Sequence, residues 1–455
     1  MEISLISLHG LLRGNNWEIG RDADNGGQIV YVMQLAQALS EMNSVGRVTL
    51  YTRLIDDPAL DRSYAEPVEK VSEKFVIRRI RFGGDRYLLK EQLWPHLDEF
   101  VANAVMQIRS EGIQAAWIHS HYADAGYAAA KLSRILGVPF VHTGHSLGRR
   151  KLEKLLASGM NELQAMERFR FRERFAAEEM TLEKAALVIC SSMQEREDYR
   201  DYEHAAQARY VVLPPGTDPE RFLPYYQERR SDEQQQARVS LKASLDKFLE
   251  HPDRPLIVAM ARADAKKNLA GLIKAYGSDL QLQAMANLAV FAGNRDDILV
   301  LPPGQSEVLR EILLLKDRFD LYGKLAIPKR HDTQWEAPEL YRLAAESRGV
   351  FVNVAFNEPF GLTLLEAAAC GLPVLATNQG GPVDIVRNLR NGILVDPRDT
   401  AAMQAGLREM VSNQALWRSF SNSGIRNLRR YYSWQSHVSR YVEEVNGVFS
   451  LSRAA

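Results

Sequence analysis

Residues 357–381, NEPFGLTLLEAAACGLPVLATNQGG, carry the pattern that decides the fold. They follow an apolar segment, 350–355, that is typical of a buried strand, and Gly361 then opens a helix-like run before a second strand at 373–377. A strand, a turn, a helix and another strand form the repeating unit of a parallel α/β sheet. The unpaired N–H groups at the start of such a helix favour an anion, and Glu366 lies about one turn further along. The layout would suit a phosphate with a neighbouring sugar.

Two glutamates at this spacing also arise by chance on an ordinary solvated helix. However, the motif E-P-F-G-L-x-x-x-E from Glu358 to Glu366, followed by G-L-P-V and Gly380-Gly381-Pro382, resembles the retaining, two-Rossmann-domain glycosyltransferases of the sucrose synthase and sucrose-phosphate synthase group. In that group the first glutamate lies beside the donor sugar and the second holds the ribose hydroxyls. The resemblance implies a catalytic role for Glu358. It also implies a donor-nucleotide site that includes Gly361, Leu362, Thr363 and Glu366.

The composition limits the class of protein. A chain of 455 residues exceeds one ordinary core, so we expect two domains. Hydrophobic residues at 46% and charged residues at 25% are typical of a soluble globular protein. Lys plus Arg equals Asp plus Glu, 57 against 57, and this zero net charge argues against a nucleic-acid binder.

The two cysteines, Cys190 and Cys370, follow apolar residues and are far apart in the sequence. We expect buried thiols, as in the reducing cytoplasm, and no metal-ligand cluster surrounds either of them. The first residues, MEISLISLHG, read as a strand without a basic leader or a cleavage site, so we expect no export signal. No apolar run approaches the length of a membrane span. These features favour a cytoplasmic protein without membrane contact.

Strand-like and helix-like segments alternate along the chain, which predicts parallel sheets with helices on both faces. In the first half the predicted strands are 2–8, 48–52, 76–82, 115–119, 139–143, 187–191 and 210–213, with a helix at 29–39. In the second half they are 256–261, 288–292, 350–355, 373–377 and 393–395. A polar stretch, 225–255, is expected to separate the halves. We therefore expect two doubly wound, Rossmann-like domains facing a cleft, the GT-B type of glycosyltransferase architecture.

The last helix helps to set the domain boundaries. Ser433 is a favoured N-cap residue and precedes a helix that should reach about Phe449. In the related glycosyltransferases this helix crosses back onto the first domain. We therefore expect an N-terminal acceptor domain of residues 1–220 plus 433–455, and a C-terminal donor domain of residues 221–432. Ligands of such folds bind at the carboxyl ends of the strands.

A stretch with adjacent cations, ARADAKKN at 261–268, follows the first strand of the second half. Cations beside a strand end can neutralise charge on a leaving diphosphate, although a single surface Arg or Lys usually only solvates a helix. The stretch is similar to the family's S-R-x-D-x-K-K-N, with Ala261 in place of the usual Ser. The resemblance implies that Arg262 and Lys267 bind the diphosphate and assist catalysis.

Two motifs of the first half belong to the same resemblance. Gly26 and Gly27 precede a helix and could present N–H groups to a phosphate or a sugar, although a Gly-Gly pair is also an ordinary tight turn. They lie where the family has its glycine-rich donor contact, and Gln28 resembles its acceptor-sugar contact. The string T-G-H-S-L-G matches the family closely, and it implies that His145 approaches the donor sugar and has a catalytic role. We expect the nearby histidines to be structural: His119, His121 and His142.

The acceptor distinguishes the members of the group. Residues 83–90, GGDRYLLK, resemble the G-G-D-K-F-L-x-K stretch of sucrose-phosphate synthases. A sugar phosphate carries about two negative charges near neutral pH, so several cations should converge on it. Lys90, Lys151 and Arg174 match the family's phosphate clamp, and Arg172 is a weaker candidate. Arg168 and Arg170 alternate with phenylalanines and are more typical of a solvated basic helix face.

The resemblance covers nearly the whole chain. It implies that glucose passes from UDP-glucose to fructose 6-phosphate with retention, giving sucrose 6-phosphate and UDP. It also implies that no metal or other cofactor is required, because the leaving phosphate itself takes the acceptor proton. The chain ends soon after the last helix, so we expect no appended phosphatase domain and, as a partner, a separate sucrose-phosphate phosphatase.

Other activities fit parts of the pattern. A sucrose synthase, or another retaining glycosyltransferase, would use an acceptor without a phosphate and would not need the clamp. A nucleotide-sugar epimerase can have the same two-domain architecture. A catalytically idle nucleotide-sugar binding protein would keep Glu366 and the glycines.

Overall fold

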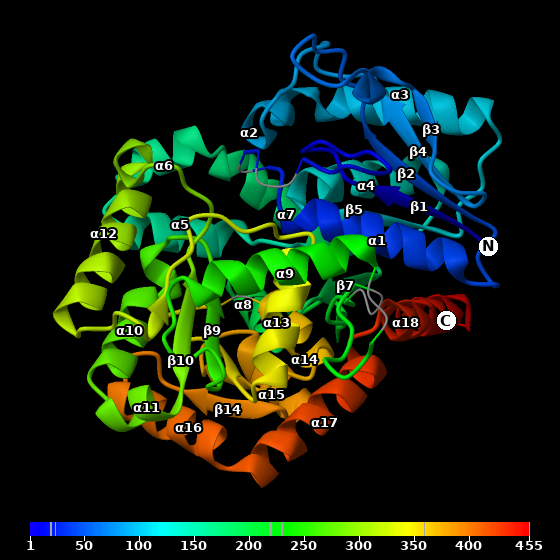
Figure 1. Ribbon diagram of the computed structural model, residues 1–455. Helices are drawn as coiled ribbons and strands as arrows, with labels where there is room; N and C mark the ends of the chain where they lie inside the picture. The colour runs from blue at the N-terminus through cyan, green and yellow to red at the C-terminus, as the bar shows by residue number, and fades with distance from the viewer. Residues whose placement is uncertain (19–20, 23, 218–220, 229–230, 359, 455) are drawn as a thin grey trace. The chain divides into compact units, whose positions relative to one another are not determined.

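The computed structural model describes residues 1–454 except 19–20, 23, 218–220, 229–230 and 359, and it does not describe the side chains of 451–454. The chain divides into two units (Figure 1): unit 1 contains Met1–Pro215 and His437–Ala455, and unit 2 contains Gly216–Ser436. Pro359 of the quoted motif, and residues 218–220 beside the expected boundary, lie outside the described residues.

Unit 1 is built on an eight-stranded sheet in the order β3-β4-β2-β1-β5-β6-β7-β8. The strands are β1 (Glu2–Ile6), β2 (Arg47–Arg53), β3 (Val68–Lys70), β4 (Phe75–Ile80), β5 (Trp117–His121), β6 (Phe140–Thr143), β7 (Leu187–Cys190) and β8 (Tyr210–Val212). All neighbouring pairs are parallel except β3 and β4, which are antiparallel. The central strands are buried on both faces, which explains why they read as continuous apolar runs.

Helices cover both faces of this sheet. They are α1 (Gly27–Glu41), α2 (Lys90–Leu93), α3 (Leu97–Ser110), α4 (Ala123–Leu136), α5 (Gly148–Ala157), α6 (Glu162–Arg168), α7 (Phe171–Lys184), α8 (Met193–Asp198) and the last helix, α18 (Trp434–Ala454). Side chains alternate along β5: Ile118 packs in the same cluster as α3 and α4, whereas His119 stacks on Tyr441 of α18.

The last helix begins at a side-chain cap and ends in unit 1. The Ser436 N–H donates to Ser433 Oγ at 3.1 Å, as expected for an N-cap serine. Further along α18, Tyr441 Oη accepts a hydrogen bond from the Trp117 indole at 2.7 Å, and Val445 is fully buried. Part of the unit 1 core is therefore made by α18.

Unit 2 contains a six-stranded parallel sheet in the order β11-β10-β9-β12-β13-β14. Its strands are β9 (Leu256–Met260), β10 (Asn287–Phe291), β11 (Leu325–Ala326), β12 (Val350–Asn353), β13 (Val374–Thr377) and β14 (Gly392–Val395). One face packs against α9 (Asp232–Asp246), α13 (Glu336–Glu346), α14 (Leu362–Ala369), α15 (Pro382–Leu389) and α17 (Gln414–Tyr431). The other face packs against α10 (Leu269–Gly277), α11 (Leu280–Met285), α12 (Pro303–Arg318) and α16 (Thr400–Ser412).

The predicted fold class, two doubly wound α/β domains, is confirmed. The expectation that 225–255 separates the halves is wrong, because this stretch contains α9, which belongs to the core of unit 2. Ala237, Leu241 and Leu245 form one buried face of α9 at a spacing of four residues, and the surrounding polar residues concealed this face in the sequence. Strands β3 and β11, which have three and two residues, were not predicted from the sequence. Among the described helices, none has both the length and the apolarity needed to cross a membrane.

Candidate active site

In unit 2, the loop after β9 is tied to the loop after β12. The Phe356 N–H donates to the Lys266 carbonyl at 2.9 Å. Buried Asn268 donates from its side-chain amide to the Val354 carbonyl at 3.2 Å and to the Pro397 carbonyl at 2.8 Å. Because β9 and β12 are neighbouring parallel strands, these contacts hold the residues at their carboxyl ends in one place.

Two predicted site residues meet between these loops. Lys267 Nζ donates to Glu358 Oε2 at 2.7 Å, and the Asn353 amide donates to the same oxygen at 3.2 Å. The two charged side chains are only 24% and 13% exposed. The Glu358 carboxylate and the Lys267 ammonium therefore hold each other in position.

The backbone around Glu358 is held in place by the glycine pair Gly380 and Gly381. Gly380 has φ +87°, a conformation that favours glycine, and a Cβ there would lie 2.2 Å from the Glu358 carbonyl oxygen. The Gly381 N–H donates to that same oxygen at 3.0 Å. The glycine pair thus permits the close approach that positions the Glu358 loop.

Helix α14 begins directly after Gly361, which has φ +95° and forms the helix N-cap without a side-chain contact. Leu362 and Thr363 are its first residues, and Leu362 is exposed. The N–H groups of such a first turn have no partner within the helix and can bind an anion. The structure thus provides the helix start on which the predicted diphosphate contact depends.

Glu366 lies on α14 and accepts a hydrogen bond at 3.2 Å from the hydroxyl of buried Tyr341. Burial raises the pKa of the Glu366 carboxyl, and the positive charge of Arg221 opposes this shift. A carboxylate with a fixed hydroxyl donor has lone pairs left for further hydroxyl groups. This arrangement is suited to binding a ribose.

The Arg262 side chain makes fewer contacts than the other charged residues of the predicted donor site. Its carbonyl accepts from the Asp264 N–H at 2.8 Å, but its side chain is exposed. Within the described part of the chain, the guanidinium forms neither a hydrogen bond nor an ion pair. Its predicted role therefore rests on its place in the motif.

In unit 1, Gly26 and Gly27 stand at the open N-terminus of α1. A Cβ added at either position would meet nothing within 4 Å, so crowding by the described residues does not explain these glycines. Gln28 donates to Ser7 Oγ at 3.2 Å at the end of β1. The approach of a ligand to this glycine pair remains a prediction.

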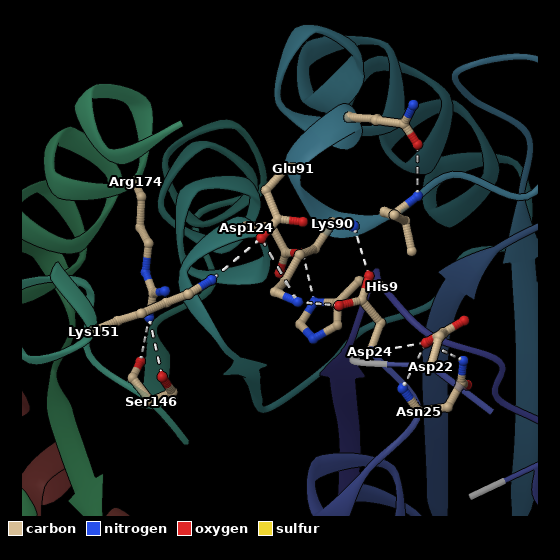
Figure 2. Close-up of polar contacts among 12 residues, drawn as sticks. His9, Asp22, Asp24, Asn25, Lys90, Glu91, Asp124, Ser146, Lys151 and Arg174 are labelled. Atoms are coloured by element: carbon tan, nitrogen blue, oxygen red, sulfur yellow. Dashed lines mark hydrogen bonds and ion pairs between the residues drawn. The ribbon is translucent and has the colours of Figure 1, made fainter. Parts of the chain in front are cut away.

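The three predicted clamp residues, Lys90, Lys151 and Arg174, lie in one region of unit 1, and we call this set the phosphate clamp (Figure 2). Lys90 is anchored twice by buried Asp24: its N–H donates to Asp24 Oδ2 at 2.7 Å, and its ammonium pairs with Asp24 Oδ1. Glu91 reaches the remaining lysine, with its Oε1 at 3.4 Å from Lys151 Nζ.

Burial lowers the pKa of the Lys151 ammonium, and the nearby charges of Lys90 and Arg174 lower it further, whereas Glu91 raises it. The Lys151 ammonium also lies 3.9 Å from the centroid of the Phe169 ring, within the range of a cation–π contact. Like charges that are held together in this way gain from a bound anion.

Arg174 is almost fully buried on α7. Its Nε donates to Glu178 Oε1 at 2.9 Å. Its NH2 group donates to the Ser146 carbonyl at 2.8 Å, as Figure 2 shows. Arg174 therefore also supports the T-G-H-S-L-G loop. Arg172, two residues earlier, is exposed and, among the described residues, has no ionic partner.

His145 lies in this loop with φ +58°. Its Nε2 is 3.0 Å from His121 Nδ1, and its ring meets Tyr31 edge to face at 4.9 Å. Burial lowers the pKa of His145 to about 3, so the ring is neutral near pH 7. The three histidines expected to be structural are buried in the core: His119, His121 and His142.

Several acidic partners at the strand ends of unit 1 were not predicted from the sequence. Buried Asp124 Oδ2 lies 2.8 Å from Nδ1 of His9, which follows β1. Asp24 and Glu91 were also missed, although both lie close in sequence to predicted site residues, Gly26 and Lys90. Their position next to a motif that contains cations was the sequence signal that could have identified these acidic residues as ion-pair partners.

Two family models match the chain. Residues 25–221 match Glycosyltransferase Family 4, and residues 242–427 match Glycosyl transferases group 1. The first match falls mainly in unit 1 and the second lies in unit 2.

Relatives and solved structures agree with these matches. The chain is 43% identical to probable sucrose-phosphate synthase 2 of Arabidopsis thaliana over 97% of its own length and 47% of that protein, so it spans about half the length of the curated relatives it matches. The sucrose-phosphate synthase structure from Thermosynechococcus elongatus is 25% identical, covers 99% of both chains and has a TM-score of 0.71. Anabaena HepE, solved in complex with UDP-glucose, is 15% identical over 98% of this chain and 100% of that chain, with a TM-score of 0.59. The two units thus match glycosyltransferase family models, and the chain is similar over nearly its whole length to sucrose-phosphate synthases.

Proposed function

We propose that this protein transfers glucose from UDP-glucose to fructose 6-phosphate with retention of the anomeric configuration, giving sucrose 6-phosphate and UDP. The observation that carries the proposal is the phosphate clamp. It combines three cations from three separate elements, and burial and like charges lower the pKa of Lys151 within it. A site of this kind is suited to a phosphate monoester and would be costly to maintain for a neutral sugar.

On the donor side, we propose that the diphosphate binds at Lys267, Arg262 and the start of α14 after Gly361. Charge develops on the leaving UDP as the glycosidic bond breaks, and fixed cations and N–H groups stabilise that charge most in the transition state. Glu366 would hold the ribose hydroxyls. HepE, which shares the fold, binds UDP-glucose according to its structure, and this supports a nucleotide-sugar donor.

The remaining roles follow from the same proposal. Glu358, held by Lys267, would lie beside the donor sugar. The neutral His145 ring would form a hydrogen bond with the same sugar without adding charge. Gly26, Gly27 and Gln28 would contact the substrates at the start of α1. The leaving phosphate would take the acceptor proton, so no metal is required. We further propose that the protein acts in the cytoplasm and that a separate sucrose-phosphate phosphatase uses its product.

The test measures UDP release from several nucleotide sugars, each with fructose 6-phosphate, fructose, glucose 6-phosphate or no acceptor. Rapid release that requires both UDP-glucose and fructose 6-phosphate supports the proposal. Equal rates with fructose would indicate a sucrose synthase-like activity. Release of UDP without a second sugar would show that no acceptor is required and would indicate an epimerase or a hydrolase. If the donor binds but no UDP is released, the result would indicate a binding protein.

A further inference from the structure

Each cation of the phosphate clamp pairs with a carboxylate in the structure. Lys90 pairs with Asp24, Arg174 pairs with Glu178, and Lys151 is left with Glu91. Three positive charges therefore face three negative ones. A phosphate with about two negative charges gains little from such a neutral set unless one carboxylate moves away.

The three carboxylates differ in how firmly they are held. Asp24 is 1% exposed and accepts from both the backbone and the side chain of Lys90. Glu178 is 4% exposed and also accepts from the Gly148 N–H and the Tyr202 hydroxyl. Glu91 is 21% exposed, and within the described residues its carboxylate contacts only the two lysines. Glu91 is the carboxylate that can leave at the lowest cost.

Glu91 also occupies the position that an anion would need. Its Oε1 lies 3.4 Å from Lys151 Nζ and 3.8 Å from Lys90 Nζ, so one oxygen faces both ammonium groups. In Figure 2, Glu91 lies beside Lys90, and a dashed line joins it to Lys151. A phosphate oxygen that bound both lysines would have to replace this carboxylate oxygen.

We propose that Glu91 is a built-in counter-ion that occupies the clamp until the acceptor phosphate displaces it, and that it thereby sets the affinity for that phosphate. The proposal rests on the proposed function, because it concerns the same acceptor site. Asp24 and Glu178 stay in place and keep Lys90 and Arg174 oriented. A ligand with a single charge, or with none, replaces Glu91 less well than a phosphate dianion, so Glu91 also acts as a specificity residue.

The experiment titrates fructose 6-phosphate and, separately, inorganic phosphate into the intact protein by calorimetry without donor. Glu91→Gln keeps the size of the side chain and removes its charge. Partly exposed ion pairs contribute modestly, so we expect the dissociation constants for both ligands to fall roughly two- to tenfold. Binding of fructose should not change. Glu111→Gln removes the same charge in unit 1 from a pair with Arg78, and it should leave both constants at the wild-type values.

A second variant, Glu91→Ala, separates the loss of charge from a new amide contact and should shift both constants in the same direction. Unchanged or weaker phosphate binding in both variants, with wild-type melting curves, would overturn the role of Glu91. Failure of the proposed function gives a different pattern. In that case fructose 6-phosphate binds no better than inorganic phosphate to any form of the protein, while the Glu91 variants still bind inorganic phosphate more tightly than the wild type.

Discussion

Lys267 Nζ lies 2.7 Å from Glu358 Oε2, although the two residues are 91 positions apart in the sequence. The lysine follows β9 and the glutamate follows β12, which are neighbouring strands of one sheet. The pair compensates two partly buried charges before any substrate binds. A diphosphate that reached Lys267 would meet an ammonium group that is already oriented, which is the preorganisation that favours catalysis.

The first prediction concerns turnover. Lys267→Ala and Arg262→Ala should each reduce kcat by about 10²–10³, because each removes a donor that is proposed to act on the departing UDP. UDP-glucose should still bind measurably, since such interactions strengthen toward the transition state. Lys266→Ala is the matched control, because this exposed neighbour contributes to the loop contact through its backbone carbonyl. Steady-state kinetics and donor titrations check this prediction, and loss of donor binding with intact kcat would contradict it.

The second prediction separates the two glutamates of the donor motif. Glu366→Ala should weaken both UDP and UDP-glucose, because it removes the proposed ribose partner. Glu358→Ala should reduce turnover and leave UDP affinity nearly unchanged, because the proposed contact is with the sugar. Calorimetric titration of both variants with UDP distinguishes these roles. Equal losses of UDP affinity in the two variants would refute the assignment.

The third prediction concerns the acceptor. Lys90→Ala should raise the KM for fructose 6-phosphate and spare UDP-glucose binding. Removing one partner of a buried charged contact costs about 2–5 kcal/mol, which is a large loss of affinity. Lys184→Ala, which removes an exposed lysine paired with Glu183, controls for the change in net charge. A Lys90→Ala variant that lost donor binding and kept its acceptor affinity would show that the clamp is assigned wrongly.

The fourth prediction concerns the chemistry of the reaction. If side chains and backbone N–H groups alone handle the charge on UDP, an excess of chelator should leave the wild-type rate unchanged. The glucosyl unit of the product should keep the α configuration of the donor, as observed by NMR. A β product, or a loss of activity that magnesium restores, would mean that the proposed mechanism is wrong.

The fifth prediction concerns stability and pH. Burial raises the pKa of Glu195 from 4.5 to about 7, and the N–H groups of Ser191 and His145 partly offset this effect. Because the folded pKa lies above the unfolded value, the native state is favoured by the protonated carboxyl, and this contribution is lost as pH rises from about 4.5 to about 7. The total change is roughly 3 kcal/mol at most.

Glu195→Gln keeps a neutral side chain at every pH. Its Tm relative to the wild type should therefore increase between pH 5 and pH 8. Glu197→Gln removes a different carboxylate from α8, where Glu197 pairs with Arg200, and serves as the matched control. A Tm difference for Glu195→Gln that stayed constant across this range would contradict a raised pKa.

Much of the fold could be predicted because its cause is local. Buried parallel strands such as β9 and β12 are continuous apolar runs, and Ser433 carries its capping chemistry in its own side chain. The short strands β3 and β11 could not be found in this way. Two or three residues contain no periodicity, and the partner strand alone defines them.

In the candidate site, too, single residues could be predicted from local sequence, whereas their contacts could not. The motifs indicated Lys267 and Glu358 separately, because each has a recognisable sequence context. Their ion pair depends on which segments the sheet order brings together. The same is true of the pairs of Lys90 with Asp24 and of Lys151 with Glu91. Sequence spacing alone does not contain that information, so the counter-ions of the predicted cations became apparent only in the folded chain.

The contribution of α18 to unit 1 has a consequence for biosynthesis. A ribosome that has made residues 1–215 has produced every strand of the first sheet, yet the Trp117 indole still lacks the Tyr441 hydroxyl that accepts its hydrogen bond. The surface of β5 that α18 covers must stay exposed to solvent or to a chaperone while more than two hundred further residues are translated. Unit 1, whose strands are all translated before those of unit 2, can thus complete its core only after α18 has been made.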